Sequence, residues 1–313
     1  MTSTLGVALV GYGHWGPNLA RSLDGVDGAE LRAVSVRTPA AAAAVAAERP
    51  GVLATTDLDA VLARRDVDVV VVATPAPTHP ELAARALRAD KHVLVEKPLA
   101  TTLQQAEELA ALAAERRRTL MVGHLYIFHP VVRRLGELLD AGDLGDLVCV
   151  TSERGNTTGT PRDGGVLWNL APHDLSIVIH LLGDDVRRVD ARQAGLEELV
   201  FLTLEMGPGA LVEVALSWVA HAKARRMTFT GSEGIAVFDE TAVAPLAVFR
   251  RRDDEAPAPV AVEAPEAIEP LRAQWEELVA AVREGRPPLT GAGHALAVQR
   301  LLDAAERSLR RAP

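Results

Sequence analysis

The stretch VDVVVVAT, at residues 67–74, restricts the possible folds of this chain more than any other. Its β-branched residues predict a strand. Its apolar side chains follow one another without the polar alternation of a strand that has one face in water. Strands of this kind are covered on both faces, as in a parallel sheet that lies between layers of helices. The stretch therefore predicts a buried parallel strand.

The first part of the chain alternates between short apolar runs and helical patterns. We predict strands at 5–10, 31–36, 67–74, 92–96 and 119–124, and helices at 19–23, 39–48, 80–90 and 102–117. Strands that alternate with helices at this spacing are typical of β–α–β units. The fold class that we expect here is α/β, with a doubly wound parallel sheet.

The pattern changes near residue 121, where strand-like runs follow one another. They lie at 146–152, 188–194, 198–206, 210–219 and 226–239, with one clear helix near 171–182, and helices return at 271–285 and 294–311. The polar, proline-rich segment 250–270 favours a solvated hairpin or loop. We therefore predict a first domain at 1–121 and a second domain at 122–313, of the α+β class with a mostly antiparallel sheet.

Composition excludes several classes of partner. The formal net charge is −9, so the chain lacks the basic surplus that is typical of proteins that bind nucleic acid. We find no basic and apolar leader and no apolar run that approaches 18 residues, so we expect a cytoplasmic protein with no membrane partner. The single cysteine, Cys149, excludes a disulfide within the chain.

Gly11, Gly13 and Gly16 form a G-x-G-x-x-G motif between the first predicted strand and the helix that follows. In this context the first glycine permits a tight turn, the second lets the backbone approach a pyrophosphate, and the third lets helix and strand pack closely. The amide groups at the start of the helix then face the phosphates. We expect the turn, with His14 and Trp15, to bind a dinucleotide.

Arg37 stands where proteins that prefer NAD carry an acidic residue, at the end of the second strand. No Asp or Glu lies between Leu31 and Glu48. An acid would bind the ribose 2′-hydroxyl and repel a 2′-phosphate, whereas an arginine can pair with that phosphate. The sequence favours NADP(H) as the cofactor, with Arg37 as the residue that recognises the 2′-phosphate. NAD(H) is possible. The alternative is an exposed arginine beside a less selective site.

Glu96, Lys97 and Pro98 end the predicted strand at 92–96. Ligands of a doubly wound sheet bind beyond the carboxyl ends of its strands, so Lys97 is expected to face the cofactor. A lysine there can hold a proton and stabilise a developing alkoxide. Glu96 is expected to hold either Lys97 or the nicotinamide ribose.

These features together resemble the glucose–fructose oxidoreductase / inositol dehydrogenase / MocA (GFO/IDH/MocA) family. The resemblance rests on GYGHWGPN, VVVATPAPTHPELAARAL, HVLVEKPLA and GGVLWNLAPHDLSIVIHLLG, and it covers almost the whole chain. It is strongest towards nucleotide-sugar 3-dehydrogenases and sugar 3-ketoreductases. It implies a dinucleotide-binding Rossmann domain, and a second domain on an open sheet for substrate binding and oligomerisation. Lys97 and His173 would be catalytic.

The segment NLAPHD contains the polar residues expected on the second domain's helix. Asn169 and His173 are spaced i, i+4, so they share a face if the helix has begun. Pro172 fits a first turn, which predicts a helix start near Leu170 and leaves Asn169 as a possible N-cap. His173 changes charge near neutral pH and suits acid–base work. Many family members carry aspartate at the position of Asn169, so we assign Asn169 to substrate orientation.

Other polar residues are weaker candidates. Asp174 is expected either to orient His173 or to contact substrate. Thr74, Pro75, Thr78 and His79 follow a strand end and are expected to border the cofactor, unless His79 caps the next helix. His124 and Tyr126 are candidates for substrate binding, with packing in the core as an equal alternative. Arg154 and Asn156 are further candidates for substrate binding, and the alternative for Arg154 is a surface salt bridge. The histidines show no spacing typical of a metal site.

We expect an enzyme that transfers a hydride to or from a ring carbon of a nucleotide-activated sugar in carbohydrate biosynthesis, with C3 as the favoured carbon. The favoured form is an NADPH-dependent ketoreductase that works as a homodimer or homotetramer. The alternatives are an NAD-dependent dehydrogenase of a free sugar or inositol, and a dinucleotide-binding regulator without catalysis. The replacement of aspartate by Asn169 is the main support for the regulator.

Overall fold

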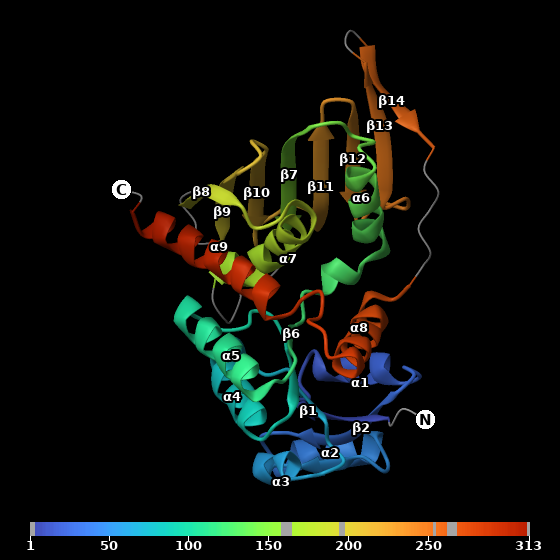
Figure 1. Ribbon diagram of the computed structural model, residues 1–313, viewed down its shortest axis with the longest axis vertical. Helices are drawn as coiled ribbons and strands as arrows, with labels where there is room; N and C mark the ends of the chain where they lie inside the picture. The colour runs from blue at the N-terminus through green and yellow to red at the C-terminus, as the bar shows by residue number, and fades with distance from the viewer. Residues whose placement is uncertain (1–3, 158–164, 194–197, 253–254, 262–267, 312–313) are drawn as a thin grey trace. The chain divides into compact units, whose positions relative to one another are not determined.

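The computed structural model describes residues 4–157, 165–193, 198–252, 255–261 and 268–311. They form two compact units, Met1–Leu125 with Glu269–Gln299, and Tyr126–Ile268 with Arg300–Pro313 (Figure 1). The division predicted from the sequence placed everything after residue 121 in the second domain. In the structure, residues 269–299 pack in the first unit.

The first unit contains a six-stranded parallel sheet with the order β3-β2-β1-β4-β5-β6. This confirms the doubly wound arrangement, since the strand order reverses between β1 and β4. Its strands are β1 (Leu5–Val10), β2 (Ala29–Ser35), β3 (Leu53–Thr55), β4 (Val69–Val72), β5 (His92–Val95) and β6 (Leu120–Val122). Its helices include α1 (Gly16–Leu23), α2 (Pro39–Glu48), α3 (Leu58–Leu62), α4 (His79–Arg88), α5 (Leu103–Arg116) and α8 (Pro270–Glu284).

Burial in this unit follows the apolar pattern of the sequence. The four valines of β4 are all buried, as expected for a strand with helices on both faces. Helix α8 adds a fully buried tryptophan, Trp275, whose indole N–H donates to Ser22 Oγ of α1 at 3.0 Å. This buried bond explains why residues distant in sequence belong to the first unit.

The second unit contains an eight-stranded sheet with the order β14-β13-β12-β11-β7-β10-β9-β8. Only β7 and β10 pair in parallel within it, so the sheet is mostly antiparallel, as predicted. Its strands are β7 (Leu147–Gly155), β8 (Val186–Gln193), β9 (Leu199–Met206), β10 (Leu211–Ser217), β11 (Ala224–Gly231), β12 (Gly234–Asp239), β13 (Leu246–Arg252) and β14 (Glu255–Val260). Helices α6 (Pro130–Asp140), α7 (Gly165–Leu182) and the C-terminal part of α9 (Ala292–Arg311) lie on the same side of this sheet (Figure 1).

The two faces of the eight-stranded sheet differ in exposure. Val200, Leu202 and Leu204 of β9 are buried, whereas Phe201 between them is 43% exposed. Leu211 of β10, on the same face as Phe201, is 39% exposed. The sheet therefore has one helix-covered face and one face that keeps exposed apolar side chains.

Several elements differ from the predictions. Helix α7 begins at Gly165 rather than near Leu170, so Asn169 is not its N-cap and Pro172 lies inside the helix. The extra turn buries Val166 and Leu167, and this burial outweighs the hydrogen bond that a proline removes. The strand-like run at 226–239 is two strands, β11 and β12.

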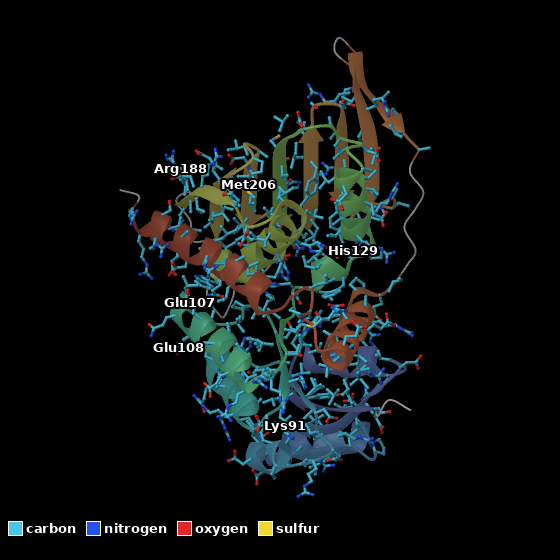
Figure 2. All side chains as sticks on the ribbon, viewed as in Figure 1. Lys91, Glu107, Glu108, His129, Arg188 and Met206 are labelled. Carbon is cyan, nitrogen blue, oxygen red and sulfur yellow. The ribbon has the colours of Figure 1, made fainter. Side chains whose placement is uncertain are left out.

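Other elements were missed. Helix α6 has an apolar spacing that could have been recognised, because Val131, Leu135 and Leu138 recur at helical intervals and are buried. His129 caps it through Nδ1, which accepts from the Val131 N–H at 3.2 Å (Figure 2). β3 and α3 are too short to show a period. Segment 250–270 holds the end of β13 and all of β14, which pair antiparallel, but its residues 253–254 and 262–267 lie outside the described residues.

Among the described residues, no helix combines the length and the apolar character needed to span a bilayer.

Candidate active site

The turn between β1 and α1 explains each of the three glycines. Gly11 has φ +97°, and a Cβ atom there would lie 2.5 Å from the Ala73 carbonyl oxygen. A Cβ atom on Gly16 would lie 2.6 Å from the Gly11 carbonyl oxygen. At Gly13 a Cβ atom would meet nothing within 4 Å. Gly11 and Gly16 are therefore required by packing, while Gly13 leaves the backbone open to a close ligand.

The first turn of α1 suits a phosphate group. Its N-cap residue, Trp15, makes no capping hydrogen bond through its side chain, and the turn contains no acidic residue. His14 is exposed on the same turn. The amide donors of a helix start carry a partial positive charge and bind anions. The donor set thus fits the pyrophosphate of a dinucleotide.

Arg37 lies two residues beyond the end of β2 and is exposed. The Gly11 N–H donates to the Ser35 carbonyl oxygen at 2.9 Å, which holds the glycine turn beside the end of β2. Among the described residues, no carboxylate forms an ion pair with Arg37. Its guanidinium is therefore available to a phosphate.

The residues after β4 form a turn with internal hydrogen bonds. Thr78 Oγ1 donates to the Pro75 carbonyl oxygen, and the hydroxyls of Thr74 and Thr78 lie 2.7 Å apart. The buried ring of His79 places Nδ1 2.8 Å from the Pro98 carbonyl oxygen and Nε2 2.7 Å from the Thr74 carbonyl oxygen. Its pKa is lowered, chiefly by burial. His79 thus ties the end of β4 to the backbone directly after Lys97.

Glu96 and Lys97 follow β5 at the same edge of the sheet, and the Lys97–Pro98 peptide bond is cis. The Glu96 carboxyl packs against Gly123, where a Cβ atom would lie 3.1 Å from it. Burial raises the pKa of Glu96 to about 7, although the Lys97 ammonium, the Lys97 amide and the Trp15 indole lower it. Trp15 faces this carboxyl, but no hydrogen bond of standard geometry joins them.

His124 follows β6 at this edge and is 3% exposed. Its Nδ1 lies 3.3 Å from Nδ1 of His294, in the first turn of α9. Burial, His294 and the Lys97 ammonium hold the pKa of His124 well below its ordinary value. His294 was not predicted, because the sequence around it resembles no motif.

In the second unit, α7 is buried along most of its length, but Asn169 and His173 are only partly buried. They are one helical turn apart, as their i, i+4 spacing predicts. The ring of Tyr126 lies edge-to-face on the His173 ring, with centroids 5.2 Å apart. These polar groups form an accessible stripe on an apolar helix.

Arg154 and Asp174 form a buried ion pair behind this stripe. Arg154 Nε lies 2.5 Å from Asp174 Oδ2, its Nη2 lies 3.1 Å from Oδ1, and Ser152 Oγ donates to Oδ1 at 2.8 Å. The two side chains are 3% and 1% exposed. Contact with the substrate was one of two expectations for each residue, with a surface salt bridge as the alternative for Arg154. The structure pairs the two inside the protein, where they fasten α7 to β7.

A second set of polar contacts surrounds Arg154. Its guanidinium lies 4.6 Å from the Tyr126 ring centroid, and the Tyr126 hydroxyl donates to Glu240 at 2.7 Å. Arg225 pairs with Arg154 in the β11–β7 register and donates to Asn156 Oδ1 at 2.6 Å. Arg225 and Glu240 were not predicted, because only strand pairing brings them to this position.

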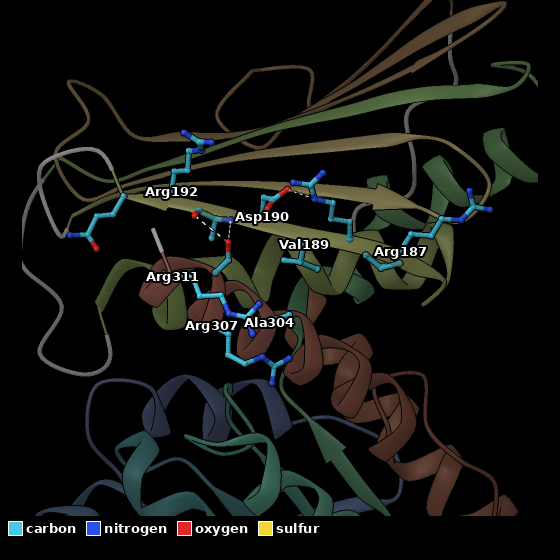
Figure 3. A pocket seen from close by; sticks show the side chains of 12 residues that line it. Arg187, Val189, Asp190, Arg192, Ala304, Arg307 and Arg311 are labelled. Carbon is cyan, nitrogen blue, oxygen red and sulfur yellow. Dashed lines mark hydrogen bonds and ion pairs between the residues drawn. The ribbon is translucent and has the colours of Figure 1, made fainter. Parts of the chain in front are cut away.

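A hollow of about 790 Å³ lies elsewhere in the second unit, between β8 and the end of α9 (Figure 3). Several arginines line it, including Arg187, Arg192 and Arg311. The Ala191 N–H donates to Ser308 Oγ at 2.9 Å and holds the helix against this edge strand. Two strands separate β8 from β7, which carries Arg154, so the hollow is not part of the polar cluster.

Comparison with known families identifies the group of proteins to which the chain is related. Residues 5–124 match the model described as an oxidoreductase family with an NAD-binding Rossmann fold. Residues 132–237 match the GFO/IDH/MocA C-terminal domain. The chain belongs to the GFO/IDH/MocA family of oxidoreductases. This membership confirms the resemblance seen in the sequence. It also confirms that the chain belongs to a family of oxidoreductases with an NAD-binding domain.

The relatives in the family include proteins whose names concern sugars or inositol. A dTDP-3,4-didehydro-2,6-dideoxy-alpha-D-glucose 3-reductase of Streptomyces violaceoruber is 33% identical over 67% of this chain and 65% of the relative. An inositol 2-dehydrogenase 2 of Saccharopolyspora erythraea is 34% identical over 68% of this chain and 66% of the relative. The chain therefore spans just under two thirds of the length of each.

A solved structure in this family covers more of the chain. It is a 3-ketoreductase from Actinomadura kijaniata in complex with TDP-benzene and NADP, in an open conformation. It is 26% identical and has a TM-score of 0.84, with 98% of both chains covered. Both domains of the GFO/IDH/MocA fold are thus present in the same chain order.

Proposed function

We propose that this protein is an NADPH-dependent ketoreductase that acts on C3 of a nucleotide-activated sugar. One observation carries the proposal: the carboxyl edge of the parallel sheet gathers an open glycine turn, Arg37, which has no described carboxylate partner, and the Glu96-Lys97 pair. Ligands of such sheets bind at this edge.

Lys97 and His173 are the proposed acid–base residues. Lys97 follows β5, where it can donate a proton to a substrate oxygen and stabilise negative charge on it. His173 lies on the accessible stripe of α7, with Asn169 one turn before it to orient the sugar. The nicotinamide, when bound, supplies the hydride.

The buried residues around α7 have a positioning role in this proposal. Arg154 and Asp174 fix the helix, and Tyr126 packs on the His173 ring. A catalytic group misplaced by about 1 Å can lose activity a hundredfold. Arg154 and Asp174 therefore support the reaction in this proposal by holding α7 in place.

The proposed preference for NADP(H) rests on Arg37. We expect Arg37→Gln to weaken NADPH binding about tenfold or more, because a charge-assisted bond to the 2′-phosphate is worth roughly 1.5–3 kcal/mol. NADH binding should not change. Arg65→Gln, an exposed arginine before β4, is the matched control. Equal losses for both cofactors would remove Arg37 from this role.

The proposed substrate class rests on the names of relatives and on the ligands of a similar solved structure. The name of one relative describes a dTDP-sugar 3-reductase, and the similar solved ketoreductase contains TDP-benzene and NADP. The second candidate is an NAD-dependent dehydrogenase of a free sugar or inositol, which the inositol dehydrogenase relative favours. We further infer a homodimer or homotetramer, formed through the exposed face of the eight-stranded sheet.

Thermal unfolding with NAD, NADH, NADP and NADPH, each with and without UDP, TDP and GDP, tests the proposal. A ligand at a hundred times its Kd stabilises the fold by about 2.7 kcal/mol. We expect the largest shift with NADPH and a further rise with one nucleoside diphosphate. A larger shift with NADH would favour the dehydrogenase, and no shift with any cofactor would contradict both functions.

Lys97→Met separates an enzyme from a dinucleotide-binding regulator. The variant should keep the NADPH-induced shift and lose turnover of the 3-keto sugar, because it retains the fold and lacks the proton donor. Unchanged turnover would remove Lys97 from the mechanism.

A further inference from the structure

Two histidines at the edge of the first unit are held in a fixed arrangement. His124 Nδ1 and His294 Nδ1 are 3.3 Å apart, and the rings meet edge-to-face with centroids separated by 5.2 Å. The Val122 N–H donates to the Thr290 carbonyl oxygen at 2.9 Å, and Thr290 Oγ1 donates to the Val122 carbonyl oxygen at 2.7 Å. These bonds fix the start of α9 against the end of β6.

The contact between the two rings requires one proton. One Nδ1 must donate and the other must accept, because two N–H groups would repel each other and two lone pairs would not bond. His124 is 3% exposed, whereas His294 is only partly buried. The pair therefore runs from the protein interior towards solvent.

Lys97 and His124 follow neighbouring strands of the parallel sheet. β5 and β6 pair with Val95 opposite Val122, and Lys97 and His124 each come two residues after these partners. The residues just before them also meet, because a Cβ atom on Gly123 would lie 3.1 Å from the Glu96 carboxyl. The Gly123 N–H donates to the Val95 carbonyl oxygen at 2.8 Å and maintains this register beyond the strand end. The electrostatic effect of the Lys97 ammonium on His124 agrees with this proximity.

We propose that His124 and His294 relay protons between the Lys97 amine and solvent. This inference rests on the proposed function, because it requires Lys97 to exchange a proton with substrate. Before transfer, His294 carries its proton on Nδ1 and His124 carries its proton on Nε2.

Each reduction consumes one proton in this scheme. Lys97 gives a proton to the sugar oxygen and is left as a neutral amine. Water gives a proton to Nε2 of His294, whose Nδ1 passes its own proton to Nδ1 of His124. His124 then gives its Nε2 proton to the Lys97 amine, so each ring gains a proton before it releases one. Each N–H bond that breaks is matched by one that forms, so one proton passes from solvent to substrate. Both rings then hold the opposite tautomer, and they return to the first arrangement by proton exchange before the next turnover. Oxidation reverses the sequence.

His294→Gln tests the relay. Glutamine can still hydrogen-bond but cannot transfer a proton along its side chain. We expect kcat to fall about tenfold or more in weak buffer, within the range that a positioned proton-transfer group contributes. Added imidazole should restore it, while KM and the NADPH-induced thermal shift stay unchanged. His221→Gln, an exposed histidine in the second unit, is the matched control and should have no effect.

Two outcomes of this test overturn the relay. One is a kcat equal to that of the unmodified protein at every buffer concentration. The other is a fall in kcat that imidazole does not restore, which would indicate a structural role for His294.

A measurement without substrate separates this inference from the proposed function. Long-range ¹H–¹⁵N NMR spectra follow the histidine rings as pH changes in the unmodified protein and in Lys97→Met. Removal of the ammonium should raise the pKa of His124, and His294→Gln assigns the signals. An unchanged His124 titration would overturn the link to Lys97, even if the enzyme reduces sugar nucleotides.

Discussion

Glu96 shows how a single residue makes stability depend on pH. Its pKa of about 7 lies above the ordinary value of 4.5, mainly because of burial. Between these pH values the folded protein holds a proton that the unfolded chain has released. The free energy of unfolding should therefore fall as pH rises through this range, by at most about 3 kcal/mol.

Glu96→Gln should abolish most of this pH dependence, because the amide does not titrate. Urea unfolding at pH 5 and pH 8 provides the measurement. Glu107→Gln is the control, since Glu107 is exposed on α5 (Figure 2). If the free energy of unfolding falls by the same amount between pH 5 and pH 8 in Glu96→Gln and in the unmodified protein, Glu96 is not the cause of the pH dependence.

Individual site residues were predictable only where a local motif marks them. The glycines, Arg37 and the Glu96-Lys97 pair could be found, because each stands at a strand end that the apolar pattern reveals. His294 and Arg225 could not, since contacts distant in sequence bring them to their positions. Arg154 and Asp174 were recognised as polar residues of interest, but their mutual burial requires the fold.

The turn between β1 and α1 contains two glycines with opposite expected behaviour. Gly11→Ala should destabilise the protein by about 2–3 kcal/mol, because a side chain at φ +97° is strained and meets the Ala73 carbonyl. Gly13→Ala should leave the free protein as stable as before, since its Cβ atom meets nothing within 4 Å. It should, however, abolish the stabilisation by NADPH, because the methyl group would occupy the space proposed for the pyrophosphate.

Thermal unfolding of both variants, with and without NADPH, distinguishes these effects. A Gly13→Ala protein that binds NADPH as well as the unmodified protein would contradict the proposed place of the phosphates.

The junction between α7 and β7 depends on the Arg154–Asp174 pair. Arg154→Met or Asp174→Leu alone should destabilise the protein by about 3–5 kcal/mol, because each leaves an unpaired buried charge. The free energy of unfolding of the double variant should fall by much less than the sum of the two single losses, since no unpaired charge stays buried. A double-mutant cycle by urea unfolding measures the coupling, and additive losses would argue against the pair.

Helix α7 also shows where local rules fail. Proline and a polar residue at 169 predict a helix start near 170, and the structure begins five residues earlier. Propensity gives way here to the burial of Val166 and Leu167, which a local pattern cannot weigh.

At the scale of the whole molecule, the exposed face of the eight-stranded sheet is expected to join copies of the chain. Phe201→Glu places a charge on this face and should convert the oligomer to single chains, as measured by light scattering after size exclusion. Val148→Glu is the control, because Val148 is 51% exposed but shares the strand face of buried Val150. Single chains before any substitution would contradict the inferred oligomer.

The overall architecture was predictable because apolar patterning is strong in both units. Four-residue buried runs such as β4 and the α/β alternation predict the parallel sheet, and successive strand-like runs predict the second sheet. The return of residues 269–299 to the first unit was not predictable. Nothing in α8 indicates locally that Trp275 packs beside Ser22.

The packing of residues 269–299 in the first unit determines when this unit can finish folding during synthesis on the ribosome. Met121 of β6 forms a bridge with Gly291, and α8 supplies the buried Trp275. A nascent chain that has passed residue 125 therefore holds an unfinished sheet edge until residues 269–299 have emerged. An isolated fragment that ends there keeps the glycine turn and Lys97 but lacks the residues that close its core.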